Sequence, residues 1–363
     1  MANEKKTVRE PSFILALVPI VAMIGFMLYC FRGHSETGYH DAHLPLVMSI
    51  IVACIVGFIC GHSFQEMLAG MVERLAASME AVLILATVGF LVTSFMLSGA
   101  IPTMIVYGLD LLTPKLFLPV GCILCAIVGM ACGSSWTTTA TIGLAFLGIG
   151  AGLGIPAPIT AGMIISGAYV GDKFSPLSDT TNLAAAVAET GLFDHVTAMV
   201  STTGPTLLLS LILYTILGLN VDTSAYDATV AEGIQEAFRG AFTISPILLL
   251  PIIVVIVMCI LRVPGLVGIA VSVATAVVFM LIFQSTDIFY SYSLGDIFDV
   301  LHYGHAVETG NAVADSILGK AKGMDGMMWT INLILVALAY GGALERCGCI
   351  EKLFGGLKHK IHS

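Results

Sequence analysis

The chain has 363 residues, of which 57% are hydrophobic and only 11% are charged, with a formal net charge of −9. Soluble domains carry about 25% charged residues, so this composition indicates an integral membrane protein. The acidic balance and the lack of any basic cluster argue against nucleic-acid binding.

Apolar runs long enough to cross a hydrocarbon core of about 30 Å recur along the chain. The first, at 12–31, follows Lys5, Lys6 and Arg9 and lacks a small-residue cleavage site. We therefore interpret it as a retained span with a cytoplasmic N-terminus. Residues 61–80 alternate apolar and charged side chains at helical spacing, which predicts an interfacial amphipathic helix. Further spans are predicted at 44–60, 81–99, 195–218, 242–261, 265–284 and 327–345, within a total of nine or ten.

The nine cysteines are spread over the chain, and seven of them lie in or beside apolar runs. Cys122 and Cys125 form a C-x-x-C, but no second pair stands at zinc-site spacing. We expect these side chains to act as small buried hydrophobes, without a disulfide framework.

Residues 116–171 contain no charged residue and no histidine. A single helix of that length would extend about 84 Å, so the segment must cross twice, or cross and re-enter. Its middle, 133–141, is rich in Gly, Ser and Thr, which suits non-helical backbone only where protein or water covers it. The glycines from Gly148 to Gly154 alternate and precede Pro156, which predicts either a hairpin tip or close helix packing through small residues.

The sequence predicts three parts. A first transmembrane repeat covers 1–218, a polar loop covers 219–241, and a second repeat begins within 242–363. Within the last part, 285–325 carries many charged residues and is interpreted as an amphipathic or interfacial helix.

Residues 166–190 place carboxylates and hydroxyls inside an otherwise apolar region. Pro176 cannot continue a helix, so a helix that enters from Ile159 should break between Asp172 and Ser178 and restart near Thr180. Interrupted helices of this kind hold the ion sites of secondary transporters, because they free backbone carbonyls beside side-chain ligands.

We predict a sodium site on this stretch, with Asp172 and Asp179 as the charged ligands. A buried carboxylate can hold a proton and then a cation, which would couple the two ions without a further device. The alternative is structural, with Asp179 capping a helix and Asp172–Lys173 forming a boundary ion pair. The full set of predicted ion-binding residues is Asp172, Ser175, Asp179, Thr180, Thr181, Asn182, Ser134, Thr137 and Thr139.

The segment Gly171-Asp-Lys-Phe-Ser-Pro-Leu-Ser-Asp-Thr-Thr-Asn-Leu-Ala184 resembles the signature of the NhaC family of sodium/proton antiporters. Gly133–Gly143 is similar to the family's first re-entrant segment, and Gly341–Glu345 also fits. The resemblance implies an all-α polytopic membrane protein with two inverted repeats, each with a re-entrant hairpin and a broken helix. It implies sodium/proton exchange across the cytoplasmic membrane, without a cofactor and without enzymatic activity.

Two alternatives to that function remain open. Some members of the superfamily exchange organic acids or amino acids, such as malate and lactate, and Lys173 and the helix start at Thr180 are the candidate anion contacts. A non-transporting fragment is the other, because no second polar motif follows residue 190. We therefore expect an incomplete second repeat, which a homo-oligomer or a separately encoded C-terminal segment would complete.

Overall fold

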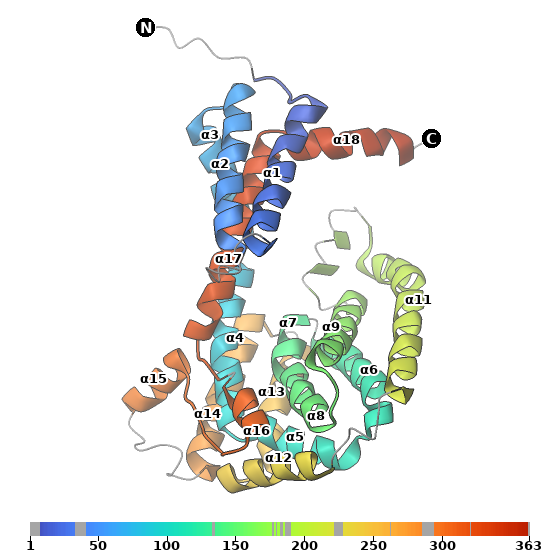
Figure 1. Cartoon of the computed structure of the whole chain (residues 1–363), viewed down its shortest axis with the longest axis vertical. Helices are drawn as coiled ribbons and strands as arrows, with labels where there is room; N and C mark the ends of the chain where they lie inside the picture. Colours follow the sequence, from blue (N-terminus) through green and yellow to red (C-terminus); the bar gives the residue numbers. More distant parts are fainter. Residues whose placement is uncertain are drawn as a thin grey trace. The chain divides into compact units, whose positions relative to one another are not determined.

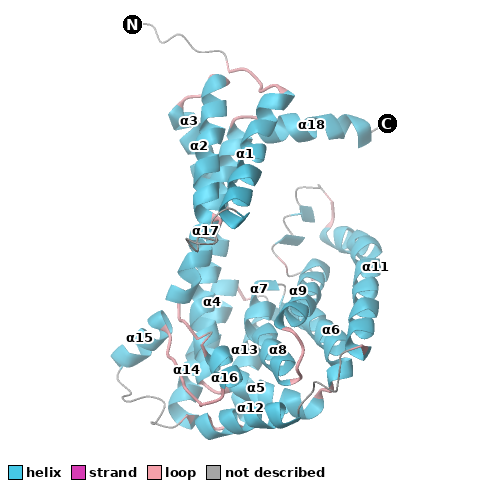
Figure 2. Ribbon diagram, viewed as in Figure 1, coloured by secondary structure: helices cyan, strands magenta, loops and turns pink. Residues whose placement is uncertain are grey.

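The computed structural model describes residues 8–32, 41–132, 135–175, 178, 180–181, 184–185, 190–220, 228–261, 263–284, 294–319 and 321–361. The regular structure of these residues is entirely helical (Figures 1 and 2), as predicted for an all-α polytopic membrane protein. The proposed inverted repeats and their boundaries stay predictions.

Four helices in the described ranges are individually long and apolar enough to cross a membrane, and two bent helix pairs raise that number to six. Three shorter apolar helices follow the same composition but have fewer residues. The four are α1 (Phe13–Arg32), α11 (Leu192–Leu219), α14 (Gly265–Phe283) and α17 (Asp325–Arg346).

The chain forms two compact units, and the first consists of residues 1–85 and 328–363. In addition to α1 and most of α17 it contains α2 (His43–Ile59), α3 (Phe64–Ala77) and α18 (Cys349–Ile361). Its apolar core joins both ends of the sequence, with Ala16, Ala53, Met67 and Ala343 fully buried. The predicted amphipathic helix is α3, which begins at a capping box: Ser63 Oγ accepts from Glu66 N, and Ser63 N donates to Glu66 Oε2.

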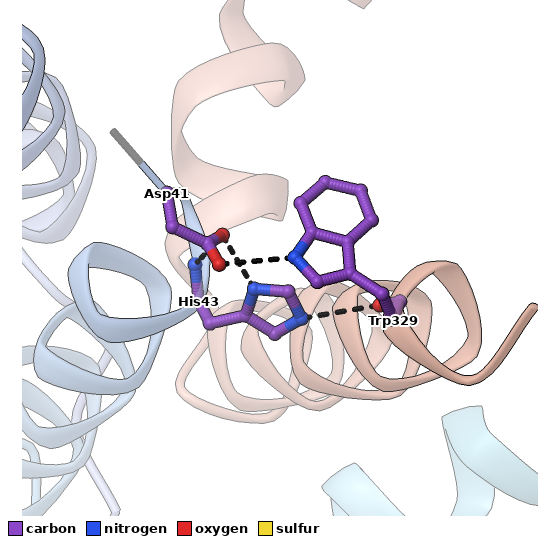
Figure 3. A network of polar contacts seen from close by, with 3 residues as sticks. All are labelled: Asp41, His43 and Trp329. Carbon is purple, nitrogen blue, oxygen red and sulfur yellow. Dashed lines mark hydrogen bonds and ion pairs between the residues drawn. The ribbon is translucent and has the colours of Figure 1, made fainter. Parts of the chain in front are cut away.

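A polar network ties the start of α2 to α17 in this unit (Figure 3). Asp41 Oδ1 lies 2.5 Å from His43 Nδ1, and Asp41 Oδ2 accepts from Trp329 Nε1 at 3.1 Å. His43 Nε2 lies 3.2 Å from the carbonyl oxygen of Trp329. The carboxylate therefore holds together two segments that are 288 residues apart in the sequence.

The second unit, residues 86–327, carries the predicted ion site. Helix α4 (Met79–Leu97), like α17, contributes residues to both units. The remaining elements are α5 (Ala100–Leu111), α6 (Pro114–Cys132), α7 (Ser135–Thr138), the π-helical turn η1 (Thr139–Gly143), α8 (Leu144–Gly152), α9 (Ala157–Phe174), α12 (Ala228–Ala241), the 3₁₀ turn η2 (Pro246–Leu249), α13 (Leu250–Ile260), α15 (Leu294–Tyr303) and α16 (Ala312–Leu318).

Helices α6 and α9 pack with their backbones in contact, and small residues make this possible. A Cβ on Gly167 or Gly171 would overlap the carbonyl oxygen of Cys122 or Ala126, respectively. From the other side, a Cβ on Gly129 would lie 2.7 Å from the carbonyl oxygen of Ala168. This row of small residues fixes the depth and rotation of α9, and so the place of the residue after Gly171.

The stretch expected to have non-helical backbone, 133–141, is helical over its described residues, 135–141. Gly148 and Gly152 are helical residues that accommodate the side chains of Ile105 and Leu109, so packing explains them. Only the end of the glycine run forms the tip of the hairpin, where Gly154 adopts a φ of +70°. The uncharged run is thus divided among α6, α7–α8 and α9 and does not form one long helix.

The segment predicted as a polar loop, 219–241, contains the helix α12 over Ala228–Ala241. Ile234 and Phe238 lie on the buried face of this helix. The helix forms because apolar residues recur at helical spacing among the charged ones. Gln235 fastens this helix to α5 by donating from Nε2 to the carbonyl oxygen of Val106 and to Asp110 Oδ1.

Candidate functional site

The site lies where α9 ends. Pro156 precedes the helix, and the last helical residue is Phe174. Ser175 has an extended backbone with φ −83° and ψ 123°, and its N–H donates to the carbonyl oxygen of Asp172 at 3.2 Å. A residue that precedes proline is disfavoured in the helical region, which explains a stop at Ser175 before Pro176. The predicted helix break is confirmed.

Asp172 stands in the last turn of α9 with only 5% of its surface exposed. Thr180 Oγ1 donates to its Oδ2 at 3.4 Å, and the hydroxyls of Ser178 and Ser135 also hydrogen-bond to the carboxylate. The Thr180 bond is longer than the roughly 2.5–3.0 Å of a tight O–H···O bond. The carboxylate is thus held by several hydroxyls, one of them loosely.

Backbone carbonyls at the end of α9 are also in contact with the returning chain. Thr181 Oγ1 lies 3.2 Å from the carbonyl oxygen of Asp172 and 3.5 Å from that of Lys173. Ser178 Oγ lies 3.0 Å from Thr180 Oγ1 and accepts from Thr181 N at 3.4 Å. A carboxylate, hydroxyls and carbonyl oxygens therefore meet over about one turn, which is the donor set that a hard cation prefers.

The α7–η1 segment brings a second polar wall to this place. Ser135 and Thr137 are 5% exposed, and α7 packs against α9. Thr139 Oγ1 donates to the carbonyl oxygen of Ser135 at 2.8 Å, so its proton is used within its own helix. The π-helical turn Thr139–Gly143 follows directly, and such turns are frequent at functional sites.

Lys173 is the cation beside the site. Its Nζ donates to Thr180 Oγ1 at 3.3 Å, so it contacts the same hydroxyl that reaches Asp172. It also interacts electrostatically with the Asp172 carboxylate, and the structural alternative of an Asp172–Lys173 boundary pair stays a prediction.

The structure gathers Asp172, Ser175, Thr180 and Thr181 of the predicted set at the break, with Thr137 and Thr139 on the neighbouring hairpin. Asp179, Asn182 and Ser134 lie outside the described residues. Sequence reasoning missed Ser135 and Ser178, which both reach the carboxylate. Ser178 could have been found, because it stands two residues after Pro176, inside the predicted break; nothing in the sequence separates Ser135 from its neighbours.

Comparison with known proteins identifies the family of this chain. A sequence model described as the Na+/H+ antiporter family matches residues 167–363, a range that starts inside α9 and includes Asp172. The Na(+)/H(+) antiporter NhaC of Alkalihalophilus pseudofirmus is 34% identical over 323 residues, which cover 89% of this chain and 68% of that protein. The chain belongs to the Na+/H+ antiporter family. Membership confirms the predicted NhaC resemblance, the sodium/proton exchange and the multi-pass location in the cell membrane.

Other members of the family differ in their named substrates. The arginine/ornithine antiporter ArcD of Halobacterium salinarum is 35% identical over 346 residues, covering 94% of this chain and 69% of that protein. The malate-2H(+)/Na(+)-lactate antiporter of Bacillus subtilis is 31% identical over 358 residues, covering 99% and 74%. No solved structure matches the chain.

Proposed function

We propose that Asp172 is the group through which this antiporter couples sodium to protons, carrying one ion and then the other. The observation that carries the proposal is the position of its carboxylate, which is 5% exposed and surrounded by hydroxyls where α9 breaks. In a membrane, an ionisable residue at a helix interruption is a functional candidate because its burial is costly.

Competition for the carboxylate provides the coupling. A sodium ion needs the negative charge of Asp172 to offset the loss of its water shell, and protonation removes that charge. Both ions therefore cannot be held at once. An exchanger with one such group returns with a proton only after it has released sodium, so the two fluxes run in opposite directions.

Neutral oxygens complete the proposed sodium shell. Ser135, Ser178 and Thr180 already contact the carboxylate, and Thr181 and Ser175 lie at the same break. On sequence grounds we retain Asp179 as a second charged ligand, together with Asn182, Ser134, Thr137 and Thr139.

The proposal concerns transport only, with no chemical change in either ion and no cofactor. Whether a homo-oligomer or a separately encoded segment adds residues to the site stays a prediction. Membership of the family implies that the protein lies in a membrane and that sodium ions and protons are its transported partners.

The test is exchange by the purified protein in proteoliposomes with imposed sodium and pH gradients. Asp172→Asn should abolish sodium-dependent proton movement, because the amide keeps the shape but cannot ionise. Asp194→Asn, the same change at an exposed position at the start of α11, is the matched control and should leave the flux unchanged. Normal coupled flux in Asp172→Asn would remove this residue from the site.

A second candidate is the sodium- or proton-coupled exchange of organic acids or amino acids. The Lys173–Thr180 contact favours it, since it places a cation next to the proposed sodium ligands, and relatives carry such names. Adding lactate, malate, arginine or ornithine to the same vesicles distinguishes the candidates: only an exchanger of that compound gains flux, and Lys173→Gln should remove a gain that depends on a carboxylate.

A further inference from the structure

Two cysteines meet at the turn between α17 and α18, in the first unit. Helix α17 ends at Arg346, and α18 begins at Cys349, so only Cys347 and Gly348 lie between them. Gly348 has a φ of +72°, a left-handed conformation that favours glycine. This turn brings the two side chains together, and the sulfur atoms lie 3.1 Å apart.

Both cysteines are buried, and a cavity reaches one of them. Cys347, which is 1% exposed, lines an open cavity of about 770 Å³, whereas Cys349 is 0% exposed and is not among the lining residues. Arg9, Arg346 and Lys352 line the same cavity, together with three glutamates. A small reagent that enters this cavity therefore meets Cys347 before Cys349.

The two thiols also differ in their pKa values. The contact with the Cys349 thiol lowers the pKa of the Cys347 thiol to about 7, outweighing its burial. The same contact, with burial, raises the pKa of Cys349. Cys347 is thus the thiol of the pair that ionises first and attacks as the thiolate, and Cys349 is the partner that keeps its proton.

We propose that Cys347 and Cys349 form a redox-active dithiol that reacts with low-molecular-weight disulfides. The Cys347 thiolate attacks one sulfur of the small disulfide, which forms a mixed disulfide and releases one small thiolate. Cys349 then loses its proton and attacks the sulfur of Cys347, which releases the second small thiol. The protein loses two electrons and the one proton of Cys349, and the small disulfide becomes one thiol and one thiolate, which takes up a proton from solvent.

This proposal replaces the expectation that all the cysteines are inert hydrophobes. That expectation rested on apolar surroundings, and it fits Cys122 and Cys125, which are buried in α6 against α9. For Cys347 and Cys349 the decisive features are the left-handed turn and the cavity, which the spacing C-G-C does not reveal.

The full-length protein itself supplies the test. Trypsin cleavage after Arg346 and Lys352 yields one peptide, Cys347-Gly-Cys-Ile-Glu-Lys352, that contains both thiols. The detergent-solubilised protein is incubated with oxidised glutathione, free thiols are blocked with N-ethylmaleimide, and the peptides are measured by mass spectrometry. We expect this peptide to become lighter by two hydrogen atoms and to stop reacting with the maleimide.

Two comparisons make the result specific. The Cys122–Cys125 pair of the same molecule should lose reactivity at least about tenfold more slowly, because it lacks access and a stabilised thiolate. Cys349→Ser should stop at a single glutathione adduct on Cys347, and Cys60→Ala should leave the reaction unchanged. A peptide 347–352 that keeps both free thiols under excess oxidised glutathione, or a disulfide that joins Cys347 to Cys60, would overturn the proposal.

Discussion

The Cα of Gly171 faces the carbonyl oxygen of Ala126 in the neighbouring helix so closely that no side chain fits between them. A Cβ there would also lie 2.7 Å from the backbone nitrogen of Met130. Both obstacles are backbone atoms, so a rotamer change cannot make room. The proposed coupling carboxylate, Asp172, is the next residue, and its position therefore depends on this contact.

Gly171→Ala should displace α9 from α6 and lower the free energy of unfolding by about 1–3 kcal/mol, as overpacking commonly does. Coupled exchange should fall with it, because the carboxylate moves away from Ser135. Thermal unfolding in detergent and vesicle flux provide the two readouts. Gly25→Ala, in α1 with no neighbouring atom within 4 Å of the new methyl group, is the control and should change neither.

Ser135→Ala and Ser178→Ala should each weaken the apparent sodium affinity roughly three- to tenfold, because each removes a neutral oxygen worth about 1 kcal/mol. Sodium-dependent proton flux, measured over a range of sodium concentrations, gives the affinities. Ser201→Ala deletes an exposed hydroxyl that bonds only the carbonyl oxygen of Ala198 in its own helix and should have no effect. If both site variants retained the wild-type affinity, these hydroxyls would be structural.

The apparent sodium affinity should weaken as pH falls, since protons and sodium compete for one carboxylate. Exchange should therefore rise with pH and fall again where protons become too scarce to drive the return step. Sodium titrations of flux at a series of pH values measure this. An affinity that stays constant between about pH 6 and pH 9 would contradict a shared site.

The Asp41 network should make the first unit sensitive to acid. The hydrogen bond from His43, helped by Trp329, holds the pKa of Asp41 below its ordinary value of 3.8. A lowered pKa contributes stability that is fully present above 3.8 and is lost as the pH falls through the folded-state value.

Asp41→Asn, which mimics the protonated acid, should thus unfold at a lower temperature than the wild type near pH 6. The difference should shrink as the pH falls below 3.8 and vanish below the folded-state pKa of Asp41. The fluorescence of Trp329 measures the unfolding of the first unit in a Trp136→Phe background, because the chain has only two tryptophans. Glu73→Gln is a control for a general charge effect, since Glu73 is exposed on α3 in the same unit. A difference between Asp41→Asn and wild type that persists at low pH would mean that the carboxylate charge is not what stabilises the contact.

The sequence by itself determined the membrane class, the family and the point where α9 breaks. Each depends on local or compositional signals: few charges, long apolar runs, and Pro176 next to Asp172 in a run of hydroxyl residues. A proline disfavours helical backbone at the residue before it, and this local effect required no tertiary information, although Pro19, Pro119 and Pro205 stand inside helices of this protein. The sequence left the role of the glycines between 148 and 154 open, because glycine occurs both in turns and at close helix contacts.

Only the tertiary structure decided which hydroxyls reach the carboxylate and which cysteines meet. Ser135 contacts Asp172 because the Gly167–Gly171 row lets α9 approach α6 and the hairpin, and that distance depends on backbone shape. Asp41 and Trp329 are brought together by packing across nearly the whole sequence. Cys347 and Cys349 are close neighbours in the chain, yet their contact depends on the left-handed conformation of Gly348 between them. The spacing of apolar residues in a sequence predicts which face of a helix is apolar. It does not predict which atoms of another segment pack against that face, and the contacts described here depend on those atoms.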